Sequence, residues 1–68
     1  MTLKEYRVEL GWNHTRLGQE AGLSRQAIGN AESGQRITAA TAKSLADALS
    51  RGFGRPIMVR DIEGLNIV

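Results

Sequence analysis

The sequence predicts an all-α fold of five helices packed as one compact domain over residues 1–68. Three observations support this class: side chains suited to N-caps precede four stretches, glycines follow several of them, and apolar residues recur within them every three to four positions. The four cap residues are Thr2, Asn13, Ser24 and Thr38. A chain this short has no room for a second domain or a large enclosed pocket.

The first helix is expected to begin after Thr2, which can form a capping box with Glu5, and to end at Gly11. Its inward stripe consists of Leu3, Tyr6 and Leu10. Arg7 is the charged exception on this stripe. On the residues alone, its stem can lie along the core while its head stays in water.

Two short helices follow, over about residues 14–21 and 25–33. An N-cap residue precedes each of them, and Gly22 is placed to end the first in a left-handed conformation. A connection this short that contains glycine sets two helices at a steep angle. We expect Gly18 to let the second helix approach closely; the alternative is a tolerated glycine that only weakens its own helix.

Thr38 is expected to cap a fourth helix within residues 37–49, whose apolar stripe consists of Ala39, Ala42, Leu45, Ala46 and Leu49. Residues 51–56 contain two glycines and the only proline, which predicts a turn. Val59 to Glu63 is predicted to form a short fifth helix, and the residues expected to close the core there are Ile57, Val59, Ile62 and Leu65. The ending GLNIV is apolar; we expect Leu65 to pack on its own domain and Ile67–Val68 to join a dimer contact.

Composition narrows the function classes. The chain has no cysteine and one histidine, so neither disulfides nor a structural metal site is expected, and no cofactor is predicted. No apolar run approaches the roughly 20 residues that span a bilayer, and the N-terminus does not resemble a signal peptide, so a cytoplasmic location is expected. The net charge is +2, and only Lys4 and Lys43 of the nine basic residues are not arginine. Arginine suits phosphate and guanine edges, although ordinary solubility charge explains the composition equally well.

Of the functions considered, an enzymatic activity has the least support in the sequence. There is no set of nucleophile, base and orienting group, and no glycine loop that would cradle a phosphate. Ser24, His14 and Asp47 can be combined on paper, but a serine engaged as a helix cap is a poor nucleophile. We therefore predict that the chain is not an enzyme.

The segment LGQEAGLSRQAI at residues 17–28, followed by ESG at residues 32–34, resembles the two-helix signature of the Cro and phage-repressor helix-turn-helix family, also called the XRE family. The resemblance extends from Leu3 to about Leu65. It implies a compact five-helix, lambda-repressor-like domain in which residues 25–33 form the recognition helix. It also implies a partly buried salt bridge between Arg7 and Glu32.

The resemblance further implies which residues touch DNA. Base contacts are expected from Arg25, Gln26 and Asn30, whose side chains are of the types that pair with guanine and adenine in the major groove. Phosphate contacts are expected from His14, Thr15, Arg16, Ser24, Gln35 and Arg36. His14 stands where the family usually has glutamine, and an ordinary surface histidine is the alternative. Gly29 either permits close approach to the groove or simply weakens the helix.

Taken together, the sequence predicts a sequence-specific regulator of transcription, most simply a repressor that occupies a double-stranded DNA operator. One such domain reads few base pairs, so a homodimer on two half-sites is expected. No membrane partner and no small-molecule effector is indicated, and in the cytoplasm the protein would associate with the nucleoid through DNA. The alternatives are an antitoxin-type autorepressor and a protein-interaction module that keeps the same fold.

Overall fold

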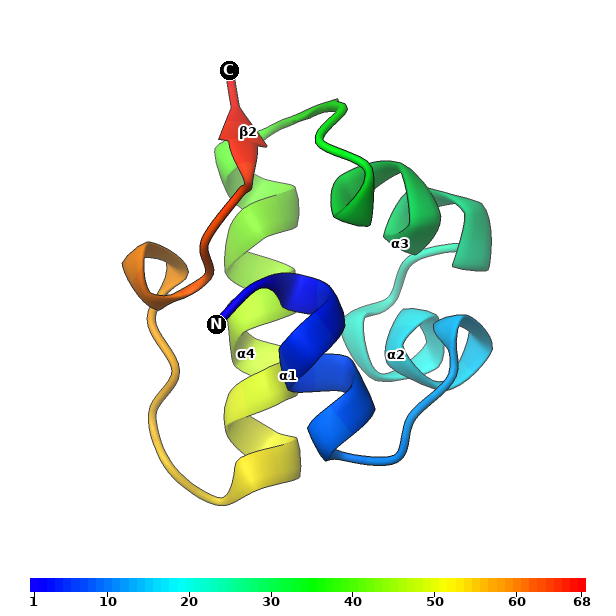
Figure 1. The fold of residues 1–68 in the computed structure, drawn as a ribbon, viewed down its shortest axis with the longest axis vertical. Helices are drawn as coiled ribbons and strands as arrows, with labels where there is room; N and C mark the ends of the chain where they lie inside the picture. Colours follow the sequence, from blue (N-terminus) through cyan, green and yellow to red (C-terminus); the bar gives the residue numbers. More distant parts are fainter.

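A computed structural model describes all 68 residues of the chain. Four α-helices, a 3₁₀ helix and two very short strands follow one another as α1 (Leu3–Glu9), α2 (His14–Ala21), α3 (Arg25–Glu32), β1 (Arg36–Ile37), α4 (Ala39–Phe53), η1 (Val59–Asp61) and β2 (Asn66–Ile67). Helix α4 is the longest element, α1 lies across it, and α2 and α3 lie together on one side (Figure 1). None of the helices has the length and apolar character needed to cross a membrane.

The starts of the four α-helices are set by local hydrogen bonds. Each predicted cap side chain accepts from the backbone amide three residues further along, and Thr2 and Glu5 complete the predicted capping box. This satisfies amides that the helix itself leaves without a partner. The predicted helix starts are therefore confirmed.

The prediction of five helices was wrong. Residues 59–63 form only the three-residue turn η1, and the end of the chain adds β2, which pairs in parallel with β1. The Glu63 amide donates to the Met1 carbonyl at 3.0 Å, and Thr2 and Glu63 form an isolated parallel bridge. Because these pairings hold the backbone extended and Gly64 follows at φ 83°, the helix cannot continue.

Helix α4 is longer than expected, because residues 51–53 continue the helix instead of forming a turn. It ends at Gly54, which lies in the left-handed region at φ 70°. A Cβ atom on Gly52 would lie 2.8 Å from Leu10 Cδ1 and 2.8 Å from the Trp12 ring, so glycine allows the α1–α2 connection to pack here. The burial pattern also differs from the predicted stripe, because Ala39 is exposed and Ala48 is buried. Helix α3 was expected to end at residue 33 but ends one residue earlier, at Glu32, and Ser33 is its C-cap.

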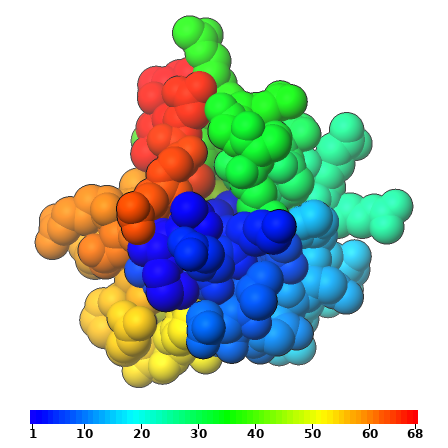
Figure 2. Space-filling view, in the orientation of Figure 1, coloured from blue at the N-terminus to red at the C-terminus, as the bar shows by residue number.

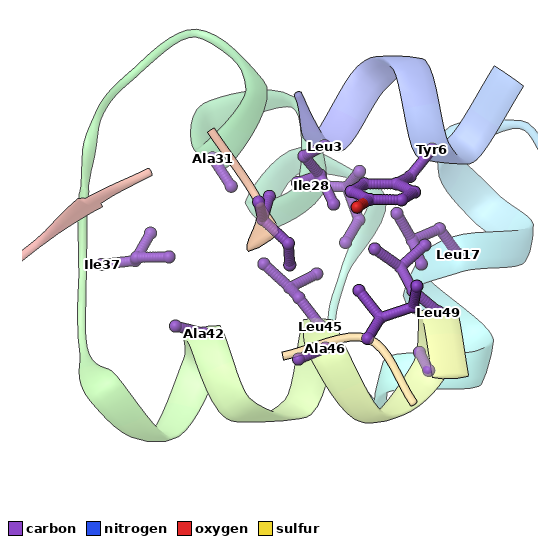
Figure 3. Packing of buried hydrophobic residues seen from close by; sticks show 13 residues of the cluster. Leu3, Tyr6, Leu17, Ile28, Ala31, Ile37, Ala42, Leu45, Ala46 and Leu49 are labelled. Carbon is purple, nitrogen blue, oxygen red and sulfur yellow. The ribbon is translucent and has the colours of Figure 1, made fainter. Parts of the chain in front are cut away.

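Thirteen buried apolar side chains form one core between α4 and the other elements. Leu17 from α2, Ile28 from α3 and Leu45 and Leu49 from α4 converge at its centre (Figure 3), and all four are fully buried. Tyr6 closes one side, its ring edge-on to Phe53 at a centroid distance of 5.6 Å. Burial of this common core fixes α3 against the rest of the domain and leaves one face of α3 outside.

Candidate nucleic-acid interface

The turn between α2 and α3 determines how α3 is presented. Gly22 ends α2 at φ 72°, and the Ser24 side chain caps α3 by accepting from the Ala27 amide at 3.1 Å. A Cβ atom on Gly18 would lie 2.5 Å from the Leu23 carbonyl oxygen, far inside van der Waals contact. The next nearest atoms are Ser24 C at 3.3 Å and Arg25 N at 3.5 Å, so Gly18 allows the turn and the first residue of α3 to approach α2 closely, as predicted.

Helix α3 has one buried and one open face. Ile28 and Ala31 are buried in the core, whereas Arg25 and Gln26 are exposed and Asn30 is half-buried. Side chains from the start of α3 project from the molecular surface at the right of the space-filling view (Figure 2). The Arg25 guanidinium takes part in none of the ion pairs of the chain, so its donors are free to meet a ligand.

The phosphate-contacting candidates flank this face but differ in their freedom. All six are exposed, but only the side chains of Thr15 at the start of α2, Gln35 in the connection after α3, and Arg36 in β1 make no hydrogen bond or ion pair within the chain. Arg16 is already engaged: its Nε lies 3.0 Å from Glu20 Oε2, and its guanidinium lies 5.0 Å from the centre of the Trp12 ring. The positive charge that Arg16 places near the start of α2 is therefore partly balanced by Glu20 within the same helix.

Behind α3, Arg7 and Glu32 form an ion pair that joins α1 to the end of α3. Arg7 Nε lies 2.6 Å from Glu32 Oε2 and Arg7 Nη2 lies 3.2 Å from Glu32 Oε1, and both side chains are nearly buried, at 12% and 10% exposure. Arg7 Nη1 also donates to the Trp12 carbonyl at 2.9 Å. The bidentate geometry holds the carboxylate in a fixed orientation.

His14 lies beside the same carboxylate. Its Nε2 lies 3.1 Å from Glu32 Oε1, and its side chain is 46% exposed. Burial by itself would raise the pKa of Glu32, but the hydrogen bonds from Arg7 and His14, together with their charges, lower it below its usual value. Glu32 is therefore an ionised acceptor that is shared between α1 and α2.

Two contacts around this surface were missing from the sequence-based predictions. One is the His14–Glu32 contact, and the other is a hydrogen bond from Arg51 Nη2 to the Glu20 carbonyl near the end of α2. A cation at a helix C-terminus complements the helix dipole, so Arg51 helps to hold α2 in place. Both contacts join residues far apart in sequence, and no local pattern marks them.

No group of three or more histidine, cysteine or acidic side chains gathers at a single point. The surface instead carries arginine, amide and hydroxyl groups beside the N-termini of α2 and α3. Such groups can donate hydrogen bonds to phosphates and base edges. A family model described as "Helix-turn-helix" matches residues 3–54, which is more than half of the chain. No curated protein and no solved structure was found to match. The chain belongs to the helix-turn-helix family of the Cro and phage-repressor (XRE) type, a family of DNA-binding regulators of transcription.

Proposed function

We propose that the protein binds double-stranded DNA in a sequence-specific manner and represses transcription by occupying an operator. The observation that carries this proposal is the open face of α3, where Arg25 and Gln26 are exposed while Ile28 on the opposite side is buried. A helix with this polarity can enter the major groove without disturbing the core. Arginine pairs with guanine there, and glutamine and asparagine pair with adenine.

Phosphate contacts on either side of α3 would set its register in the groove. On one side lie the backbone amides at the start of α2, with the side chains of His14, Thr15 and Arg16. On the other side lie Gln35 and Arg36, which are exposed after the end of α3. The Ser24 oxygen accepts from the Ala27 amide as a cap, and its hydroxyl proton remains available to a phosphate.

The experiment first selects bound sites from random duplex DNA with the purified chain, and then measures affinity for the selected site. Arg25→Ala is expected to lower the preference for one base pair by about 1–3 kcal/mol. Arg36→Ala is expected to weaken all duplexes alike and to reduce the slope of log affinity against log salt by about one.

Arg55→Ala is the matched control, because it removes the same charge from the loop after α4, at the opposite end of the molecule from α3 (Figure 1). Arg55 lies over the Phe53 ring at 5.3 Å and takes no part in the proposed interface. Equal losses of affinity in Arg25→Ala and Arg55→Ala would leave only a general charge effect and would refute base reading by α3.

We propose further that a second copy of the chain binds the face formed by η1 and β2. A groove of about 590 Å³ lies there, and most of its lining is apolar, including Ile57, Val59 and Ile67. Only one edge of β2 is paired, and Ile67 and Val68 are 41% and 69% exposed. An open strand edge can pair with its own copy across a two-fold axis, which is the symmetry that two half-sites require.

The oligomeric state tests this face directly. Light scattering of the purified chain is expected to give the mass of a dimer, and Ile67→Asp is expected to give a monomer with weaker DNA affinity. Val8→Asp is the matched control, since Val8 is 57% exposed on α1. A monomeric wild type on and off DNA, or dimer loss in Val8→Asp alone, would refute the assignment of this face.

A further inference from the structure

His14 is the only histidine in the chain and the first residue of α2. The charged groups facing its ring from neighbouring elements are Glu32 at the end of α3, 3.1 Å from Nε2, and the Arg7 guanidinium from α1, which holds the same carboxylate. Histidine changes charge between about pH 5 and 8, unlike most other side chains. The half-exposed ring of His14 therefore lies between the nearly buried Arg7–Glu32 ion pair and the solvent.

The geometry determines which ring nitrogen carries the proton in neutral His14. The ionised Glu32 carboxylate only accepts hydrogen bonds, so Nε2 must be the donor. In the neutral ring Nδ1 is then a bare acceptor, and the ring makes no other hydrogen bond within the chain. Nδ1 is thus the only ring nitrogen still available to an external ligand.

A phosphate oxygen is also an acceptor, so neutral His14 has nothing to donate to it. We propose that His14 binds a DNA phosphate only in its protonated form, through Nδ1–H, so that DNA binding takes up one proton. This inference rests on the proposed function. The Glu32 carboxylate supports the cationic ring, because it keeps the Nε2–H bond in either protonation state and balances the added charge.

The sign of the pH dependence follows from linkage. Because the complex holds more protons than the free partners, affinity is highest at low pH and decreases as the pH rises. One linked proton limits the change to about tenfold per pH unit. We expect the Kd to increase by about fivefold or more between pH 6 and pH 8. About fivefold is the lower end of the range over which one binding event usually changes the affinity for another.

The test measures Kd by fluorescence anisotropy from pH 6 to pH 8.5 at constant ionic strength, for the wild type and for His14→Gln. Glutamine keeps an amide donor but cannot titrate, so the variant is expected to bind with little pH dependence. Every other ionisable group, including the Met1 amino group that pairs with Glu63, is present in both proteins, so the difference between their slopes reports His14 alone.

Calorimetry in two buffers of different ionisation enthalpy counts the protons directly, and up to one is expected for the wild type near pH 7. NMR of the wild-type imidazole supplies a readout that does not depend on a variant. Addition of duplex DNA is expected to move the titration of the ring to higher pH and to protonate Nδ1. A titration unmoved by saturating DNA would overturn the inference.

These outcomes separate the two proposals. If no duplex binds even at low salt, the proposed function fails and the proton linkage fails with it. If duplexes bind and Arg36→Ala lowers the salt slope, but wild type and His14→Gln share one pH profile, only the role of His14 is refuted. A His14→Gln protein that melts early but keeps the wild-type pH slope would likewise limit His14 to a structural role.

Discussion

Two glycines in neighbouring helices give opposite predictions when replaced by alanine. Gly18 lies inside α2 and Gly29 inside α3, so helix propensity alone predicts a gain of about 1 kcal/mol for each variant. The structure distinguishes the two positions. A Cβ atom on Gly29 would meet nothing within 4 Å, whereas a Cβ atom on Gly18 would lie 2.5 Å from the Leu23 carbonyl oxygen.

The magnitude for Gly18→Ala depends on how far the turn can move. The Leu23 amide donates to the Gly18 carbonyl at 2.8 Å, and the Ser24 side chain caps α3 directly afterwards, so the turn backbone has little freedom. Overpacking at such a site costs about 2–3 kcal/mol. After the gain in propensity is subtracted, a net loss of about 1–2 kcal/mol remains.

Thermal unfolding followed by circular dichroism measures both variants. For a domain of this size about 1 kcal/mol corresponds to roughly 4–8 °C in Tm, so Gly18→Ala is expected to melt lower and Gly29→Ala higher than the wild type. Equal or raised Tm in Gly18→Ala would show that the close approach to the turn is unimportant. Gly29 lies on the open face of α3. The DNA affinity of the stabilised Gly29→Ala protein therefore also tests whether the approach of α3 to the major groove requires glycine at this position.

The remaining predictions concern the ion pair and one cap. Arg7→Met leaves the nearly buried Glu32 carboxylate without its main partner and is expected to lower the free energy of unfolding by about 3 kcal/mol in urea titrations, whereas Arg7→Met combined with Glu32→Leu is expected to lose less. Because the folded-state pKa of Glu32 is lowered, its contribution to stability is present above about pH 5 and lost as the pH falls through the folded value. Glu32→Gln is therefore expected to flatten the acid branch of the stability profile, and an unchanged acid branch would contradict this account. Thr38→Ala removes the bond that the Thr41 amide donates at 3.1 Å and is expected to cost about 1 kcal/mol; a Tm equal to that of the wild type would contradict this cap assignment.

The features of this protein that depend on contacts between residues close together in the chain could be predicted from its sequence. The starts of α1 to α4 depend on bonds between a cap side chain and an amide three residues on, and the end of α2 depends on Gly22. The family signature consists of the same caps, turn glycine and core positions, so the fold family was predictable too. The assignment of Arg25, Gln26 and Asn30 to bases stays a prediction.

Only the tertiary structure decided the features that depend on distant partners. The α1–α2 connection packs closely against Gly52 near the end of α4, and residues 59–63 are not an α-helix because Glu63 pairs with the N-terminus. His14 lies 18 positions from Glu32 in the chain, and only the angle between α2 and α3 brings its imidazole to that carboxylate. Local hydrogen bonds can be inferred from neighbouring residues, whereas these contacts exist only once the core has packed the helices together.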